Sequence, residues 1–111
     1  MKLVVVLSSN DSETVWNAFR FANTGLARAD AVQVFLLGKG VEAGLAGTLQ
    51  FDIQEQIALF RSRGGALIGC GVCCESRRDE MPSLVSSLAC EMGSMNQLHE
   101  LIAQADKVLS F

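Results

Sequence analysis

Three of the chain's four cysteines lie within five positions, in the segment LIGCGVCCESRR at residues 67–78. These thiols, Cys70, Cys73 and Cys74, follow directly after an apolar run that is typical of a strand. Isolated cysteines are often small hydrophobic residues of the core, but a cluster of thiols favours a function. Such a cluster can hold a metal ion, form a disulfide, or provide one nucleophile with neighbouring thiols.

Cys70 is the best-placed nucleophile of the three. If a helical turn begins near Gly71, Cys70 lies at its N-terminal edge, where backbone N–H groups stabilise an anion by roughly 0.3–1 kcal/mol, up to about 2. This predicts that the thiol pKa falls from about 8.5 to about 7–8, which gives a sizeable thiolate fraction at neutral pH. Gly69 and Gly71 flank Cys70 and leave backbone N–H groups open to an anion or a second sulfur, so we expect both to bind substrate.

The C-x-x-C spacing of Cys70 and Cys73 also resembles half of a zinc site or a thioredoxin-like couple. A structural zinc needs four ligands, and only Cys74, Cys90 or His99 could complete the set, so we predict no metal. The thioredoxin motif follows the first βα unit of its fold, whereas this one follows the third apolar run. A disulfide from Cys70 to Cys73 or Cys74 stays open as a resting or resolving state. Cys90 is expected in the core of a fourth strand.

Two further features carry weaker signals. Arg77 could steer an anionic substrate, but a solvated face on a short helix explains Arg77 and Arg78 equally well. The segment GKGVEAG at 38–44 follows an apolar run, but its glycines do not fit the dinucleotide-binding pattern, which favours a tight turn. We therefore predict no cofactor.

Short β-branched runs alternate with helical patterns along the chain. The runs are residues 2–8, 31–37, 65–70, 87–92 and 107–111. Unbroken apolar runs suit strands that are buried on both faces, as in a parallel sheet. We predict one α/β domain over residues 1–111, a three-layer α/β/α sandwich around a five-stranded, mostly parallel sheet. Ligands of such sheets bind beyond the carboxyl ends of the strands, where the three thiols are expected.

Apolar residues at helical spacing predict three helices between these strands. The pairs Asn10–Glu13 and Asp52–Glu55 resemble capping boxes that begin the first two helices. The apolar faces expected for the three helices are Val15, Phe19, Ala22 and Leu26; Ile53, Ile57 and Phe60; and Met95, Leu98, Ile102 and Ala105.

Composition restricts the partners and the compartment. The net charge is −3 and no basic run extends beyond Arg77 and Arg78, which gives no electrostatic footprint for nucleic acid or an anionic membrane. The first apolar run has five residues, fewer than the about 7–15 of a secretory signal, and polar residues follow it. We therefore expect a cytoplasmic protein with reduced thiols and with small molecules or proteins as partners.

Three stretches together resemble one known family. KLVVVLSSNDSETVWNAFRFANTGLARADAVQVFLLGKGVE (2–42), GALIGCGVCCESR (65–77) and MGSMNQLHELIAQADKVLSF (92–111) resemble, in order, the DsrE/DsrF-like family of sulfur oxidation and sulfur relay. The resemblance implies a three-layer domain that assembles into dimers, trimers or hexamers. It also implies a cysteine at the end of the third strand that carries sulfane sulfur as a persulfide. That cysteine falls on Cys70, and Cys73 and Cys74 are additional to the single reactive cysteine of the simplest relay members.

The residues and the resemblance together favour a sulfur carrier or sulfurtransferase-like protein. Cys70 is its expected persulfide nucleophile, and Cys73 or Cys74 its resolving thiol. The expected partners are sulfur donor and acceptor proteins or small persulfides, in a homo-oligomer. Two alternatives stay open: a metal-binding or redox-sensing thiol module, and a non-catalytic subunit of a sulfur-metabolism complex.

Overall fold

Five parallel strands form one sheet in the order β4-β3-β2-β1-β5. The computed structural model describes residues 1–88 and 90–111 of the chain. The strands are β1 (Lys2–Leu7), β2 (Ala31–Leu36), β3 (Ala66–Cys70), β4 (Glu91–Gly93) and β5 (Lys107–Ser110). The predicted α/β class and the five-stranded parallel sheet are confirmed.

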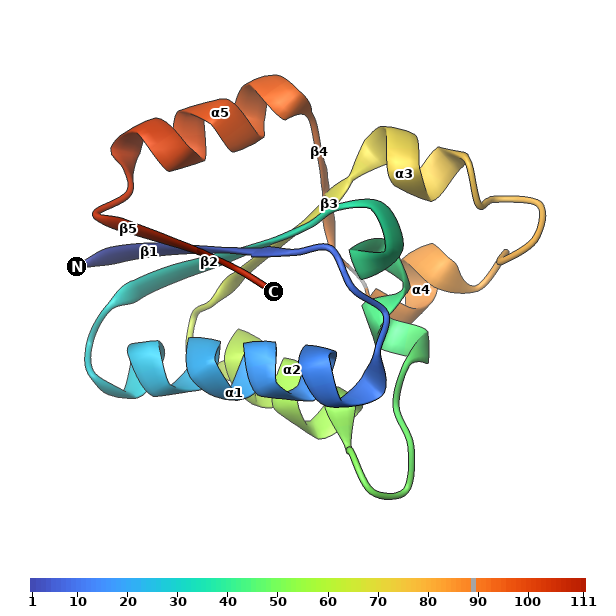
Figure 1. The fold of residues 1–111 in the computed structure, drawn as a ribbon, viewed down its shortest axis with the longest axis horizontal. Helices are drawn as coiled ribbons and strands as arrows, with labels where there is room; N and C mark the ends of the chain where they lie inside the picture. Colours follow the sequence, from blue (N-terminus) through green and yellow to red (C-terminus); the bar gives the residue numbers. More distant parts are fainter. Residues whose placement is uncertain (89) are drawn as a thin grey trace.

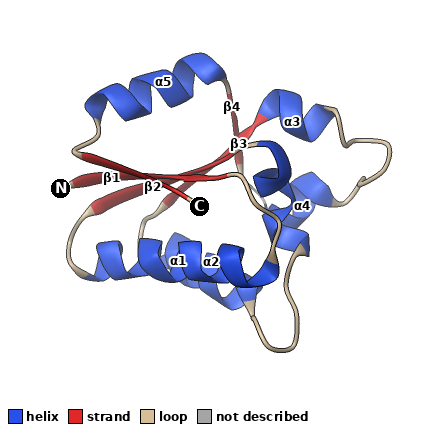
Figure 2. Cartoon of the chain, viewed as in Figure 1, coloured by secondary structure: helices blue, strands red, loops and turns tan. Residues whose placement is uncertain are grey.

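Helices cover both faces of this sheet (Figure 1). The longer ones are α1 (Ser12–Ala27), α2 (Ile53–Ser62) and α5 (Met95–Gln104). Helices α1 and α2 lie side by side on one face, and α5 lies on the other. Three short helices, η1 (Gly38–Leu45), α3 (Gly71–Glu75) and α4 (Leu84–Leu88), gather around the end of the sheet where β2 and β3 finish (Figure 2).

Helices α1 and α2 both begin at polar capping residues, but the cap of α1 lies one residue later than predicted. Helix α2 begins as predicted, because the Asp52 carboxylate accepts the backbone N–H of Glu55 at 3.0 Å. Helix α1 is capped by Asp11, one residue later than predicted, and its carboxylate accepts the N–H of Thr14 at 3.0 Å. Asn10 instead donates its side-chain amide to another element of the fold, as described below.

The core lies mainly between the sheet and the α1–α2 layer. The apolar faces predicted for α1 and α2 are buried there, apart from the half-buried Leu26, and Phe19 and Phe60 meet edge to face with 5.8 Å between their ring centroids. Helix α5 behaves differently, because only Leu98 of its predicted apolar face is buried while Met95 and Ile102 are exposed. The α5 side of the sheet is therefore less completely covered within one chain.

The fourth strand is shorter and later than predicted. The run 87–92 does not form one strand: Leu88 ends α4, Glu91 begins β4, and position 89 lies outside the described residues. The physical reason is helical spacing, since Leu84 and Leu88 lie one turn apart and are both buried. Cys90 therefore precedes β4 instead of lying within it, and it packs half-buried against the core.

The segment after β2 forms the 3-10 helix η1 rather than the predicted tight turn. Gly38 opens it with a positive φ of 55°, and Gly40 is pressed against the end of β1. A Cβ atom at Gly40 would lie only 1.8 Å from the carbonyl oxygen of Leu7. The absence of a side chain at this position thus fixes how closely η1 approaches β1.

Gly40→Ala should destabilise the fold more than a glycine replacement that meets only backbone strain. The matched control is Gly64→Ala, because Gly64 has a φ of 86° but nothing within 4 Å of an added Cβ. We expect the control to lower the free energy of unfolding by about 1–2 kcal/mol and Gly40→Ala to lower it clearly further. Urea unfolding of both variants measures the difference, and equal losses would contradict the close approach of η1 to β1.

Candidate functional site

Cys70 occupies the junction between β3 and α3. It is the last residue of the strand and the N-cap of the helix, with extended φ and ψ of −60° and 114°. Its Sγ accepts the backbone N–H of Cys73 at 3.3 Å. The predicted position of Cys70, at the N-terminal edge of a turn that begins at Gly71, therefore agrees with the structure. Its side chain is nevertheless buried, with the residue only 4% exposed.

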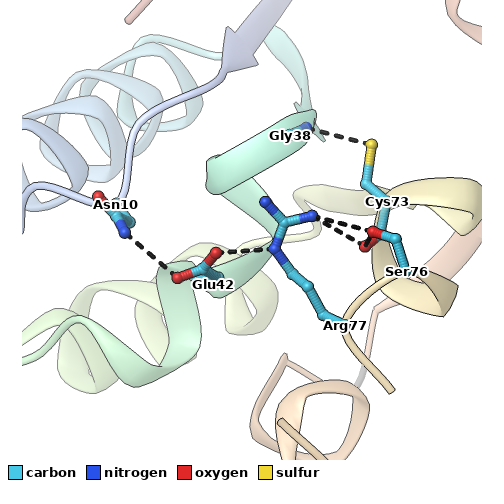
Figure 3. Close-up of polar contacts among 6 residues, drawn as sticks. All are labelled: Asn10, Gly38, Glu42, Cys73, Ser76 and Arg77. Carbon is cyan, nitrogen blue, oxygen red and sulfur yellow. Dashed lines mark hydrogen bonds and ion pairs between the residues drawn. The ribbon is translucent and has the colours of Figure 1, made fainter. Parts of the chain in front are cut away.

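Cys73 connects this turn to the neighbouring strand end. Its Sγ accepts the backbone N–H of Gly38, the first residue of η1, at 3.3 Å (Figure 3). Its own N–H donates to the Cys70 sulfur, and the Cys73 thiol lies near enough to raise the pKa of Cys70. The carboxyl ends of β2 and β3 thus bring two thiols together, each facing a backbone N–H donor.

A depression of about 630 Å³ opens beside these two thiols. The residues that line it come from the ends of β3 and β4 and the starts of α3 and α5; they are Cys70, Gly71, Val72, Cys73, Gly93, Ser94 and Met95. Val72 is 81% exposed at its rim, and Met95 is exposed across from it. A group bound to Cys70 or Cys73 would lie in this depression and contact mainly apolar side chains.

The two glycines proposed for substrate binding lie in different environments. Gly71 lines the depression, and a Cβ there would lie 3.3 Å from the carbonyl oxygen of Gly93. Gly69 is buried inside β3 and is not among the described residues that line the depression. A Cβ at Gly69 would lie 2.9 Å from the Cys90 sulfur, so its small size makes room for that side chain.

Arg77 belongs to a polar network that fastens α3 to η1 (Figure 3). Its Nε pairs with Glu42 Oε2 at 2.7 Å, and its Nη1 donates to the Cys73 carbonyl at 3.0 Å and to Ser76 Oγ at 3.3 Å. Glu42 Oε1 accepts from the side-chain amide of Asn10 at 3.2 Å.

The Glu42–Arg77 pair is mostly shielded, with side chains 15% and 22% exposed. The hydrogen bond from Arg77 is the main reason that the pKa of Glu42 lies below its ordinary value. Because the guanidinium is already paired, Arg77 acts in this structure as a positioning residue for the backbone of Cys73. The sequence did not indicate Glu42, and it indicated Asn10 only as a helix cap, since their partners here lie 35 and 32 residues away along the chain.

Burial governs the ionisation of the thiols. It is the largest cause that raises the pKa of Cys70, and the neighbouring Cys73 thiol raises it further, while the N–H groups of Cys73 and Val72 lower it. The predicted lowering of the Cys70 pKa is therefore wrong for the single chain, because loss of hydration outweighs the N–H groups of the turn. Burial likewise raises the pKa of Cys74 and Cys90.

The remaining thiols lie behind the turn. Cys74 is buried on the inner side of α3, and Cys90 is half-buried ahead of β4; all four cysteines are free. Over residues 1–88 and 90–111, no three His, Cys, Asp or Glu side chains are grouped so that they could hold a metal ion. Within the same residues, no helix is both long and apolar enough to cross a membrane.

The fold and the site together are those of a small α/β/α protein with five parallel strands and a cysteine-rich turn after the third strand. The sequence model of the DsrE/DsrF-like family matches residues 1–111, and the chain therefore belongs to this family, which is associated with sulfur relay. The predicted family is confirmed.

Relatives and solved structures of similar length agree with this membership. The chain is 25% identical to uncharacterized protein MJ0989 of Methanocaldococcus jannaschii over the whole of both chains. It is 26% identical to uncharacterized protein MK0008 of Methanopyrus kandleri, covering 89% of this chain and 83% of that protein. The crystal structure of the YchN protein from E. coli superposes with a TM-score of 0.79 at 23% identity over all of both chains. A protein of unknown function from Bacteroides thetaiotaomicron, BT1422, superposes with a TM-score of 0.72 at 22% identity, covering 99% and 94% of the two chains.

Raised thiol pKa values make the stability of the fold sensitive to alkaline pH. Below the ordinary thiol pKa, the folded and unfolded chains are both protonated, so the contribution of a buried thiol is fully present. Above about pH 8.5 the unfolded chain ionises first, and the free energy of unfolding falls as pH rises toward the folded pKa. Cys74→Ala removes one such thiol, so we expect a shallower fall than in the parent chain. Urea unfolding across this pH range measures both slopes, and parallel curves would contradict the assigned burial effect on Cys74.

Proposed function

We propose that the protein is a cytoplasmic sulfur carrier that accepts sulfane sulfur on Cys70 as a persulfide and passes it to an acceptor thiol. One observation carries the proposal: Cys70 ends β3 beside an open depression, with its sulfur facing the backbone N–H of Cys73. Membership of a family associated with sulfur relay supports the same assignment. Sulfur donor and acceptor proteins or small persulfides are the proposed partners.

Sulfur acceptance is a displacement at the outer sulfur of a donor persulfide. The Cys70 sulfur attacks this sulfane sulfur, the bond between it and the donor's inner sulfur breaks, and the electron pair leaves with the donor sulfur. Because burial keeps Cys70 protonated in the free chain, its proton passes to the departing donor thiolate. The products are a Cys70 persulfide and a donor thiol.

The surroundings of Cys70 suit the second transfer as well. The outer sulfur of the persulfide would extend into the depression, where Val72 and Met95 provide apolar contacts. When an acceptor thiol attacks this outer sulfur, the Cys70 sulfur becomes the leaving group and gains negative charge. The N–H of Cys73, which already faces that sulfur at 3.3 Å, stabilises the charge as it forms.

Cys73 offers a second route, in which the sulfane sulfur on Cys70 is reduced to hydrosulfide instead of being transferred to an acceptor. Attack of its thiol on the inner sulfur of the Cys70 persulfide would break the persulfide bond, expel the outer sulfur as hydrosulfide and leave a Cys70–Cys73 disulfide. The backbone N–H of Cys73 faces the Cys70 sulfur at 3.3 Å, and the Cys73 thiol lies near enough to raise the pKa of Cys70, which supports this role for Cys73.

Incubation with polysulfide should add the mass of sulfur to the folded chain, and Cys70→Ser should lose this adduct. Cys73→Ser is the matched control, because it makes the same chemical change three residues away and removes the nearby resolving thiol. We therefore expect the adduct to persist, or to increase, in Cys73→Ser. Intact-mass spectrometry without reductant measures all three proteins, and dithiothreitol should remove the adduct. An adduct that survives in Cys70→Ser would refute the assignment.

Homo-oligomerisation is part of the same proposal. Apolar side chains stay exposed around the site, including Val72 and Met95 at the depression and Ile102 on α5. A second copy of the chain on this side would cover them and exclude water from the persulfide.

Sedimentation at micromolar concentration should give a mass above that of one chain. Ile102→Asp places a charge on the exposed face of α5 and should shift the mass toward one chain, whereas His99→Asp serves as a control on the same helix. A mass of one chain for the parent protein would contradict the proposed assembly.

A further inference from the structure

Two thiols that the persulfide step does not use lie next to each other behind the site. A Cβ atom built at Gly69 would lie 2.9 Å from the Cys90 sulfur and 3.7 Å from the Cys74 sulfur. The two sulfurs are therefore separated by no more than the sum of these distances. The absence of a side chain at position 69 makes room for the Cys90 sulfur, while the contact with the Cys74 sulfur would be an ordinary one.

Cys74 is also adjacent to the proposed persulfide. Cys70 caps α3 and Cys74 follows four residues later, which places both side chains on one side of the turn. Negative charge on Cys90, Cys70 or Cys73 each raises the pKa of Cys74. Cys74 therefore lies near both Cys70 and Cys90.

We propose that Cys74 and Cys90 form a second dithiol, which reduces the Cys70 persulfide to hydrosulfide and ends as a Cys74–Cys90 disulfide. This inference deepens the proposed function and rests on it, because the oxidant is the sulfane sulfur carried by Cys70. It assigns a role to Cys90, which the sequence places only in the core.

The reaction proceeds by two thiol–disulfide exchanges. In the first, Cys74 attacks the inner sulfur of the Cys70 persulfide, and the outer sulfur leaves with the bonding electron pair as hydrosulfide. In the second, Cys90 attacks the Cys74 sulfur of the Cys70–Cys74 disulfide, and Cys70 leaves as a thiolate and takes up a proton. Overall, the sulfane sulfur gains two electrons, the two thiols lose them, and their two protons pass to hydrogen sulfide and Cys70.

Burial suits this pair to an internal reaction. Cys74 is 5% exposed, and burial keeps both Cys74 and Cys90 as thiols at neutral pH. Thiols react with external oxidants mainly as accessible thiolates, so burial slows the oxidation of these two thiols by reagents in solution without preventing it. The sulfur on Cys70 is the oxidising group that Cys74 can reach from inside the fold.

Trypsin separates the two halves of the proposed pair. Cys70, Cys73 and Cys74 all lie in the peptide GGALIGCGVCCESR between Arg63 and Arg77, whereas Cys90 lies in the peptide from Asp79 to Lys107. A disulfide within the triad only makes the first peptide lighter by two hydrogens. A disulfide to Cys90 links the two peptides, and mass spectrometry without reductant distinguishes the two outcomes.

The folded chain is treated in two arms, one with diamide, which oxidises dithiols without a persulfide, and one with polysulfide. Free thiols are then alkylated at low pH and the chain is digested. We expect linked peptides in both arms. Cys74→Ser should reduce them to background in both, and Cys73→Ser should keep them. Cys70→Ser should keep the link with diamide and lose it with polysulfide.

Absence of the link in the diamide arm, or its persistence in Cys74→Ser, would overturn the pairing. If Cys70 takes up sulfur but the linked peptides form only with diamide and not with polysulfide, the proposed reduction of the persulfide by Cys74 and Cys90 is wrong. If Cys70 takes up no sulfur at all, the proposed function fails, and a diamide link would still support the thiol pair.

Discussion

The site depends on one change of backbone direction at Cys70, where β3 ends and α3 begins. A strand that finishes inside a parallel sheet must turn away at its carboxyl end, and here the turn is held by the N–H of Cys73 on the Cys70 sulfur. A thiol thus takes the place that an aspartate, asparagine or serine commonly has at a helix start. The same atom therefore completes the local structure and provides the candidate nucleophile.

Two opposing effects act on that sulfur, and their balance explains its resting state. The N–H groups of the turn favour the thiolate, while enclosure between the sheet and α3 favours the neutral thiol. Enclosure is the larger effect, because a sulfur with little access to water loses more hydration than two N–H groups replace. Cys70 is therefore held at the end of the sheet but left protonated, so that under the proposed function charge develops on it only during sulfur transfer.

Most of the fold could be predicted from local patterns, because they report on neighbours close in sequence. The buried faces of α1 and α2, the cap at Asp52 and the strand before Cys70 all follow from periodicity and short-range hydrogen bonds. The division of residues 87–92 between α4 and β4 could not, since an apolar run of that length suits either element.

The ionisation of the thiols was even harder to predict from the sequence than the division between α4 and β4. The pKa of Cys70 and the neighbourhood of Cys90 are set by packing between segments that are distant in the chain. Gly69 was the one available signal that the Cys74 and Cys90 sulfurs lie close by, as a glycine inside a buried strand indicates a close neighbour.

The two sides of the site differ in how they are built. On one side, η1 lies close against the carbonyl of Leu7, because Gly40 has no side chain. Helix η1 packs closely against β1, and through the Gly38 N–H and the Glu42–Arg77 pair it contacts both the sulfur and the carbonyl of Cys73. The opposite side consists of exposed apolar side chains on Val72 and Met95, which can change rotamer at little cost. Under the proposed function, a partner would therefore meet exposed apolar side chains on one side of the depression and a hydrogen-bonded backbone on the other.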